Sequence, residues 1–253
     1  MRLAMNGCEY VGTTTLGYAI SGWAEDALGA SIGFHDHFKI PHVSHPPGDS
    51  KEENDKAYAN WSAGKGSDPT RIGLTTEEQE LFLALTPNLQ EMFQRYHLDY
   101  HLQPSFYAAP HHNVIGMHVE EAVYAPLYYG YGGPGEYADR TQMVRHIEER
   151  MLEMAPDTVN ILVTATPEVI RQRMKDDPHE NAVLREKDIE HVLHRFEEEF
   201  DKSLISNKFS IDTSIATVDE SLAEFVEKIE PFLNDSDRTC ILVEKAKKAG
   251  EWV

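Results

Sequence analysis

Residues 1–16 of the chain read MRLAMNGCEYVGTTTL. A short apolar run, Leu3–Met5, is followed by Gly7, four further residues and then Gly12-Thr13-Thr14. This is the frame G-x-x-x-x-G-K-[ST] of a loop whose backbone N–H groups surround phosphate oxygens, with Thr13 in the lysine position. The apolar run predicts a short buried strand before the loop. The missing lysine removes the point charge that normally reaches the outer phosphates.

The residues after the loop predict a helix that begins beside the phosphate site. Apolar residues recur at helical spacing, at Leu16, Ala19, Ile20 and Trp23. We therefore expect a strand over residues 1–6 and a helix over about residues 13–28, whose dipole directs its positive end at the loop. The alternative is an ordinary strand-to-helix turn that uses glycine for positive φ, with Thr13 or Thr14 capping the helix.

The composition is that of a globular protein with an acidic surface. The 253 residues carry 43 Asp and Glu against 23 Lys and Arg, for a net charge of −20, which repels nucleic acid unless a local basic patch overrides it. The densest basic run, Lys245–Lys248, is typical of a solvated helix face. No apolar run reaches the ~20 residues that a membrane span needs, and two cysteines are too few for a disulfide framework. We expect a cytoplasmic protein with no membrane partner and do not favour nucleic acid as a partner.

Strands and helices alternate along the rest of the chain. The predicted strands cover residues 1–6, part of 30–40, 113–119, 158–165 and 208–212, and the predicted helices cover about 13–28, 76–102, 140–154, much of 167–205, and 217–232 as the last. This alternation predicts an α/β fold with a parallel five-stranded sheet and helices on both faces. We expect a single domain over 1–253, with a polar loop or insertion at about 41–73 and a charged helical region at about 167–205.

Polar residues follow several of the predicted strands. They are the loop at 7–14, Asp36, Glu120 and the threonines of 164–166. Because the carboxyl ends of parallel strands meet at one edge of a sheet, these residues should lie close together. A carboxylate at that edge can hold Mg²⁺ or accept a proton. Their convergence predicts a site for phosphoryl transfer.

With these motifs the chain resembles the nucleotide-kinase branch of the P-loop kinases, the thymidylate-kinase and deoxynucleoside-kinase group. The similar stretches are GCEYVGTTT (7–15), NVIGMHVEEAVYAPLYYG (113–130), NILVTATPEVIRQRMKDDP (160–178) and FSIDTS (209–214). They look like the family's phosphate loop, its apolar strand with a following acid, its late strand with a P-E-x-x-x-x-R helix, and its last strand. The resemblance covers most of the chain as an order of motifs. It implies a P-loop NTPase fold of nucleotide-kinase type with a helical lid at about 167–205.

The resemblance implies an ATP-dependent kinase. Such a phosphotransferase moves the γ-phosphoryl group of ATP, or of another nucleoside triphosphate, to a small-molecule acceptor, with a nucleoside or nucleotide as the first expectation. ATP and Mg²⁺ are the implied cofactors. The sequence leaves the oligomeric state open, with a homodimer as one option. Two departures from the family pattern stand out: Thr13 replaces the lysine, and Glu121 stands where arginine usually follows the acid.

The expected donor site lies in the loop. The residues that would cradle the donor phosphates are Gly7, Gly12, Thr13, Thr14 and Thr15, and the Thr14 hydroxyl would also contact Mg²⁺. Glu120 is the expected general base or metal ligand, with Asp36 as the second candidate. The alternative is that Glu120 and Glu121 are solvated or pair with nearby arginines.

The charged region that follows the fourth strand supplies the candidate cations. Arg173 is the first candidate for a catalytic arginine that neutralises charge on the transferred group, and Arg171 and Arg185 are further candidates for binding the donor. The alternative is that these arginines form exposed i,i+4 ion pairs on a mixed-charge helix.

Two other functions remain open on the sequence alone. A nucleotide-binding protein without transfer activity would account for Thr13 in place of lysine. A metal-dependent hydrolase could be built around His35, Asp36 and His37, because an H-x-H strand end can place two imidazoles on one ion. Otherwise these histidines are expected to line the acceptor pocket or to cap the strand.

Overall fold

A single parallel sheet forms the centre of the protein. The computed structural model describes residues 1–30, 32–36, 76–179 and 182–251. The strands are β1 (Arg2–Asn6), β2 (Gly33–Asp36), β3 (His112–Ile115), β4 (Val159–Thr164) and β5 (Lys208–Asp212). They form a five-stranded sheet in the order β2-β3-β1-β4-β5, and every neighbouring pair is parallel. The predicted polar segment at about 41–73 lies outside the described residues.

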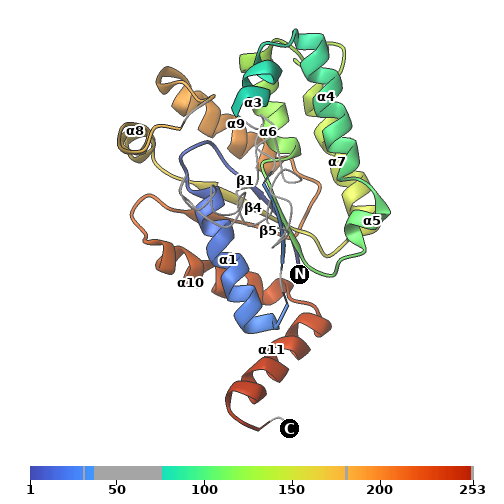
Figure 1. Ribbon diagram of the computed structural model, residues 1–253, viewed down its shortest axis with the longest axis vertical. Coiled ribbons are helices and arrows are strands. Elements are labelled where there is room, and N and C mark those ends of the chain that lie inside the picture. Colours follow the sequence, from blue (N-terminus) through green and yellow to red (C-terminus); the bar gives the residue numbers. More distant parts are fainter. Residues whose placement is uncertain (31, 37–75, 180–181, 252–253) are drawn as a thin grey trace, which may run out of the picture.

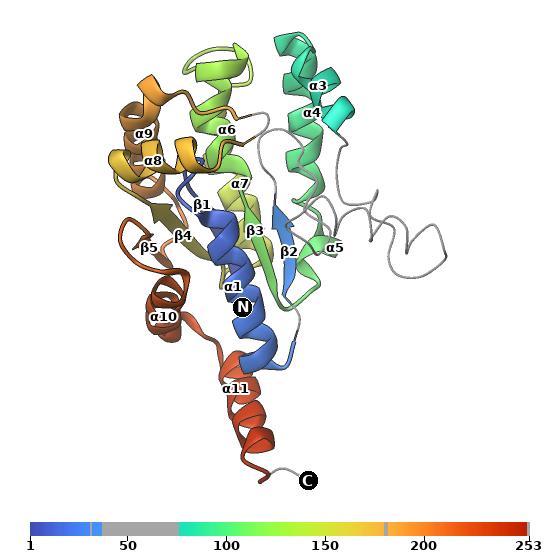
Figure 2. The ribbon, with the colours of Figure 1, turned by 60° about the vertical axis from the view of Figure 1, so that its left-hand side comes forward.

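Helices cover both faces of the sheet (Figures 1 and 2). On one face, α1 (Thr13–Leu28) packs against α10 (Val218–Ile229) and α11 (Asp235–Lys248). On the other face, α6 (His118–Tyr124) packs against α7 (Arg140–Met154) and α9 (Ile189–Asp201). The remaining elements are α3 (Thr76–Leu83), α4 (Pro87–Tyr100), α5 (Pro104–Tyr107), the π-helix η2 (Ala125–Tyr129), α8 (Pro167–Asp176) and the 3-10 turns η3 (Glu186–Asp188) and η4 (Glu230–Phe232). The predicted fold class is confirmed.

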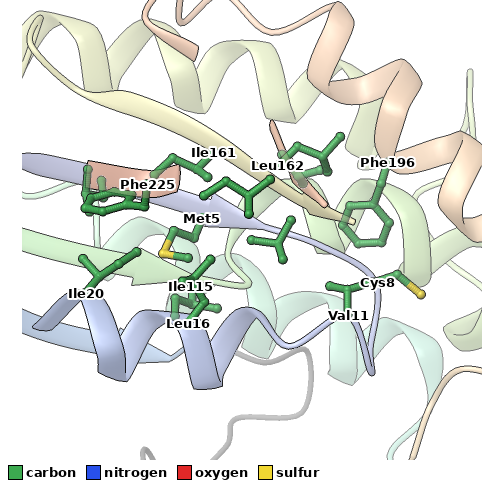
Figure 3. Close-up of a cluster of buried hydrophobic side chains, with 14 of the residues drawn as sticks. Met5, Cys8, Val11, Leu16, Ile20, Ile115, Ile161, Leu162, Phe196 and Phe225 are labelled. Atoms are coloured by element: carbon green, nitrogen blue, oxygen red, sulfur yellow. The ribbon is translucent and has the colours of Figure 1, made fainter. Parts of the chain in front are cut away.

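Neighbouring side chains of the central strand β1 belong to two separate apolar clusters, one on each face of the sheet. Met5 packs in one cluster with Leu16 and Ile20 of α1 (Figure 3). The adjacent Ala4 belongs to a second cluster that includes Leu98 of α4. Successive side chains of a strand point to opposite faces, so one short buried strand supports both helical layers.

Several helices and strands begin and end at the residues that local sequence signals predict. Helix α1 runs over Thr13–Leu28 and ends at Gly29, whose φ of +63° is the left-handed conformation that glycine adopts at helix ends. Helix α7 and strand β5 also occupy the residues predicted for them, 140–154 and 208–212. Among the described residues, no helix combines the length and apolar character that a membrane crossing requires.

The predicted strand at 113–119 is wrong in its second half. Strand β3 ends at Ile115, Gly116 takes a φ of +67°, and α6 begins at His118. Glu120 and Glu121 therefore lie in the first turn of a helix and do not end a strand. The left-handed glycine turns the chain out of the sheet, and carboxylates are favoured at a helix N-terminus by the helix dipole.

Two helix predictions also need correction. The helix predicted at 76–102 is divided into α3 and α4, because Pro87 occupies the first turn of α4 and cannot continue the preceding helix. The helix predicted at 217–232 is not the last one, because α11 follows it behind a capping box formed by Asn234 and Asp237. The basic run at 245–248 lies in the last turn of α11, on a helix as expected.

Candidate functional site

The glycine loop lies between β1 and α1 at the carboxyl edge of the sheet. Gly12 is the N-cap of α1 and adopts φ +89°, ψ 23°. Tyr10 also has a positive φ of 68°, which is strained for a residue with a side chain. The N–H of Val11 donates to the carbonyl of Cys8 at 3.3 Å and closes a turn. Such strain persists only where the surrounding contacts hold the backbone in place.

Gly7 is packed too closely to carry a side chain. A Cβ at this position would lie 2.7 Å from the carbonyl oxygen of Val163 and 2.8 Å from Oγ1 of Thr13. The first glycine of the motif therefore lets the loop pass directly over the end of β4. The Thr13 side chain packs against the same glycine.

The start of α1 has no capping side chain. Gly12 has no capping side chain, so the expected alternative of a threonine N-cap is not found among the described residues. The Thr13 hydroxyl is buried and has no hydrogen-bond partner within the described part of the chain. Thr14 is half-buried, and Thr15 is exposed. Backbone N–H groups at a helix N-terminus and the buried Thr13 hydroxyl are donors that a phosphate group would satisfy.

Glu120 reaches the loop from the first turn of α6. Its Oε1 accepts a hydrogen bond from the N–H of Gly7 at 3.2 Å, and the side chain is buried. The structure thus brings the predicted acid and the predicted phosphate loop into contact. One N–H group of the loop already faces a carboxylate.

Glu9 and Tyr10 connect the loop to the chain that follows α8. Oε2 of Glu9 accepts from the N–H of Val183 at 2.8 Å and from that of Leu184 at 2.6 Å. The Tyr10 hydroxyl accepts a hydrogen bond from the N–H of His179 at 3.0 Å. The Tyr10 and His179 rings stack with their centroids 4.1 Å apart. Sequence reasoning missed both residues, although an acid inside a phosphate loop is itself an unusual signal.

Arg173 is the candidate arginine that the structure places at the loop. Its Nη1 donates to the carbonyl of Tyr10 at 2.9 Å and lies 3.9 Å from the point where a Cβ on Gly12 would be. Its Nη2 donates to the carbonyl of Thr213 at 2.8 Å. Burial lowers the pKa of Arg173, and the nearby Asp212 only partly offsets this.

Thr213 joins the end of β5 to the loop and was also missed by sequence reasoning. Its hydroxyl donates to the carbonyl of Val11 at 2.6 Å and accepts from Arg173 at 3.1 Å. Thr213 belongs to the FSIDTS stretch, which the sequence analysis matched to the family's last strand. That match did not indicate which residues Thr213 contacts.

The other two candidate arginines contact different elements. Arg171 forms ion pairs with Glu190 of α9 and, at 3.7 Å, with Glu168 of its own helix. The Arg185 guanidinium lies over the ring of Tyr128, 5.1 Å from its centroid. These contacts match the expected alternative of surface pairing for Arg171, and the binding roles of both arginines stay predictions.

Asp36 ends β2, the strand beside β3, and its Cα pairs with that of Ile115. Its backbone therefore lies at the carboxyl edge of the sheet, as predicted. The side chains of His35 and Asp36, and all of His37, lie outside what the structure describes. The hydrolase alternative built on these three residues stays a prediction.

Cys8 packs into the core beneath the loop. Figure 3 shows Cys8 and Val11 beside Phe196 at one end of the apolar cluster. Burial raises the pKa of the Cys8 thiol far above its ordinary value, more than the hydrogen bond with Tyr124 lowers it. The thiol therefore stays protonated and acts as a small apolar side chain.

Glu121 turns away from the loop into a buried ion-pair network. Nε of Arg140 donates to Glu121 at 3.0 Å, and Nη1 of Arg140 donates to Glu91 of α4 at 3.0 Å. The Tyr131 hydroxyl also donates to Glu121, at 3.1 Å. For Glu121, the expected alternative of pairing with an arginine is confirmed. Sequence reasoning did not identify Arg140 as the partner.

Comparison with known proteins supports the fold assignment. No family model and no curated protein matches the sequence. Among solved structures, a thymidylate kinase from Candida albicans is 14% identical, with a TM-score of 0.51 over 92% of this chain and 95% of that one. A deoxyadenosine kinase from M. mycoides with bound dATP is 12% identical, with a TM-score of 0.49 over 91% of this chain and 100% of that one. The chain has the fold of a P-loop nucleoside or nucleotide kinase, as its motif order indicated.

Proposed function

We propose that this protein is a phosphotransferase that binds ATP, or another nucleoside triphosphate, on the loop at residues 7–15 and transfers the γ-phosphoryl group to a small acceptor. The observation that carries the proposal is the start of α1, where Gly12 provides no side-chain cap and the buried Thr13 hydroxyl has no partner among the described residues. Backbone N–H groups in this arrangement bind phosphate without a side-chain charge. The fold shared with a thymidylate kinase supports a nucleoside or nucleotide acceptor.

Thr14 and Glu120 are the residues that would hold Mg²⁺ at this site. The described residues contain no group of three or more His, Cys, Asp or Glu side chains able to hold a metal ion by themselves. This fits Mg²⁺, which commonly uses one or two protein oxygens together with substrate phosphates and water. When bound, the ion neutralises phosphate charge.

Within the transfer reaction, each remaining residue has a separate task. The Glu120 carboxylate accepts the proton of the acceptor hydroxyl, and Asp36 is the second candidate for this role. The loop residues Gly7, Gly12, Thr13, Thr14 and Thr15 position the donor phosphates. Arg173 stabilises charge on the transferred group, and Arg171 and Arg185 assist if closure brings them to the donor.

The charges around the loop predict how nucleotide binding depends on Mg²⁺. The loop contains one buried carboxylate, Glu9, and is contacted by a second, Glu120, and by the guanidinium of Arg173. With threonine in the lysine position, a free triphosphate meets net negative charge. We expect calorimetry to show ATP binding at least ~10-fold tighter with millimolar Mg²⁺ than with EDTA. The absence of heat with any nucleoside triphosphate in the presence of Mg²⁺ would overturn the proposal.

The variant Glu120→Gln tests the chemical step. It retains an oxygen that accepts the hydrogen bond from Gly7 but cannot act as a base, so kcat should fall by about 10²-fold or more with little change in the KM for ATP. The measurement is acceptor-dependent ADP release over a panel of nucleosides and nucleotides. Glu149→Gln, an exposed glutamate on α7, is the matched control and should leave the rate unchanged. A normal rate for Glu120→Gln would remove Glu120 from the mechanism.

A nucleotide-binding protein without transfer activity is the second candidate. Two observations favour it: threonine in the lysine position, and the contact of the Glu120 carboxylate with the Gly7 N–H, which occupies one donor of the loop. This candidate predicts heat on adding Mg²⁺ and ATP but no acceptor-dependent ADP release from the unmodified protein. The same two measurements therefore separate the two functions.

A further inference from the structure

A groove lies among α6, η2, α7 and α9 on one side of the sheet, and we call it the α6–α9 groove. Its volume is about 710 Å³, which is within the usual range for small-molecule sites. Helices α7 and α9 both pack against α6, as can be followed in Figure 1. The lining that the structure describes includes none of the loop residues 7–15, and neither Glu120 nor Arg173. The groove is therefore separate from the proposed transfer site.

The apolar part of the groove comes from the second half of α6 and from η2. Its side chains are those of Ala122, Val123, Pro126 and Leu127. Residues four apart lie on the same side of a helix, so these four residues form one continuous apolar surface. Such a surface suits the apolar or aromatic body of a ligand, because binding removes both surfaces from water.

Two arginines from different helices are held together in the charged part of the groove. Glu199 of α9 is buried, and its carboxylate accepts from Nη2 of Arg145 at 2.7 Å and from Nη2 of Arg195 at 2.8 Å. Nη2 of Arg145 also donates to the carbonyl of Glu199 at 3.2 Å. Because one carboxylate fixes both guanidiniums, they lose little further side-chain entropy when they bind a ligand.

Both guanidiniums keep N–H groups for an additional oxygen ligand. Nη1 of Arg145 donates to Glu148 at 2.9 Å, and Nη1 of Arg195 pairs with Glu198. A guanidinium has five N–H donors, and within the described part of the chain the Nε of neither arginine has an acceptor. Each arginine side chain is 22% exposed, so a ligand in the groove can reach it.

The groove has a positively charged lining on a strongly acidic protein. The whole chain carries a net charge of −20. In the lining that the structure describes, the charged residues are three cations and one carboxylate: Arg145, Arg195, Lys202 and Glu199. Glu148 and Glu198 also pair with the arginines but do not line the groove. A local excess of cations attracts an anion even where the whole molecule repels one.

We propose that the α6–α9 groove binds a small organic anion. The apolar or aromatic body of this ligand packs on α6 and η2, and its carboxylate or phosphate group accepts hydrogen bonds from Arg145 and Arg195. The planar guanidinium donates paired N–H bonds to either oxyanion. Lys202 adds a third positive charge, which favours a phosphate dianion over a carboxylate. This inference does not depend on the proposed function.

Displacement of a fluorescent aromatic anion is the first test. The probe is anilinonaphthalene sulfonate, an apolar body with one anionic group, titrated into the full chain with millimolar Mg²⁺ and ATP present. We expect it to bind with a Kd of about 10–100 µM. Phenyl phosphate and benzoate should displace the probe, with phenyl phosphate effective at the lower concentration. Benzyl alcohol, a neutral molecule of similar size, should not displace it, because it brings no charge to the arginines.

A variant that fills the groove locates the probe. Ala122→Phe adds a ring to the apolar part of the groove and removes no ion pair, so probe binding should weaken by about 10-fold or more. Ala246→Phe, at a half-buried position on α11, is the matched control and should bind the probe as the unmodified protein does. Circular dichroism and thermal unfolding establish that each variant is folded.

A second variant tests the arginines and keeps the proposal falsifiable if Ala122→Phe does not fold. Arg195→Lys leaves a cation beside Glu199 but removes the planar fork, so phenyl phosphate should bind about 5-fold or more weakly. Arg238→Lys changes an arginine of α11 that pairs with a glutamate, and it should have no effect. The proposal is overturned by equal probe binding in the two phenylalanine variants, by equal phenyl phosphate binding in the two lysine variants, or by displacement with benzyl alcohol as effective as with the anions.

Discussion

At the scale of single residues, the two glycines of the loop have different physical tasks. Gly12 adopts a left-handed φ of +89°, which starts α1 without a capping side chain. Gly7 leaves room for the carbonyl of Val163 and for the Thr13 hydroxyl. The spacing of the motif predicts both glycines, but only the packing distinguishes a conformational role from a steric one.

Gly7→Ala tests the steric role. The added Cβ would lie 2.7 Å from a backbone oxygen of β4, which cannot move without disturbing the sheet. We expect a loss of about 2 kcal/mol in the free energy of unfolding and at least ~10-fold weaker ATP binding. Urea denaturation and calorimetry measure the two effects.

Gly22→Ala is the matched control for this variant. Gly22 lies on α1 and a Cβ there would meet nothing within 4 Å. The substitution should stabilise the protein by about 0.5–1 kcal/mol and leave nucleotide binding unchanged, because alanine favours a helix interior over glycine. ATP binding by Gly7→Ala equal to that of Gly22→Ala would contradict the steric role.

At the scale of elements, one buried arginine joins three helices. Arg140 begins α7 and pairs with Glu121 of α6 and Glu91 of α4. Burial lowers the pKa of the Arg140 guanidinium, but the adjacent carboxylates of Glu121 and Glu91 outweigh this and raise it above its ordinary value. Arg140 therefore stays charged, and its hydrogen bonds to Glu121 and Glu91 fix the relative orientation of the three helices.

Arg140→Met should be among the most destabilising substitutions in the chain. It keeps most of the side-chain volume but leaves the buried Glu121 carboxylate without a cation, whereas Glu91 still pairs with Arg95, and the expected cost is about 3–5 kcal/mol. Arg150→Met, on the same helix but partly exposed, should cost about 1 kcal/mol or less. Chemical denaturation of both variants gives the comparison. Equal losses would show that the buried network contributes no more than a surface pair.

At the scale of the whole molecule, stability should depend on pH through a histidine on α4. Burial lowers the pKa of His97 to about 4, whereas an unfolded histidine has a pKa of about 6.5. Between these values the unfolded chain binds the additional proton, so the free energy of unfolding falls as the pH is lowered from about 6.5 towards 4.

His97→Gln tests this dependence. From pH 7.5 to pH 5, the unmodified protein should lose about 2 kcal/mol more of its free energy of unfolding than the variant does. Urea denaturation at the two pH values measures the difference, which also cancels the effect of the chain's large negative charge. His146→Gln, at an exposed position on α7, should behave as the unmodified protein does. The same loss in all three proteins would exclude His97 as the cause.

Short-range patterns in the sequence were sufficient to predict much of this protein. Periodicity and end signals within some 15 residues determine α1, α7 and β5, and the spacing of Gly7 and Gly12 identifies the loop. These features depend on backbone geometry and on burial of one side of an element, which neighbouring residues encode. The parallel sheet then follows from the alternation of strands and helices.

Only the tertiary structure decided which distant groups meet. Glu120 contacts Gly7 across 113 residues of chain, and Arg173 contacts Tyr10 across 163. The orientation of α4 was also decided at long range, because apolar periodicity alone does not show that Glu91 pairs with Arg140, 49 residues away. Because that ion pair is buried, turning the helix would leave Arg140 without one of its carboxylate partners in the interior, so α4 keeps large side chains such as Met92 and Tyr96 at the surface.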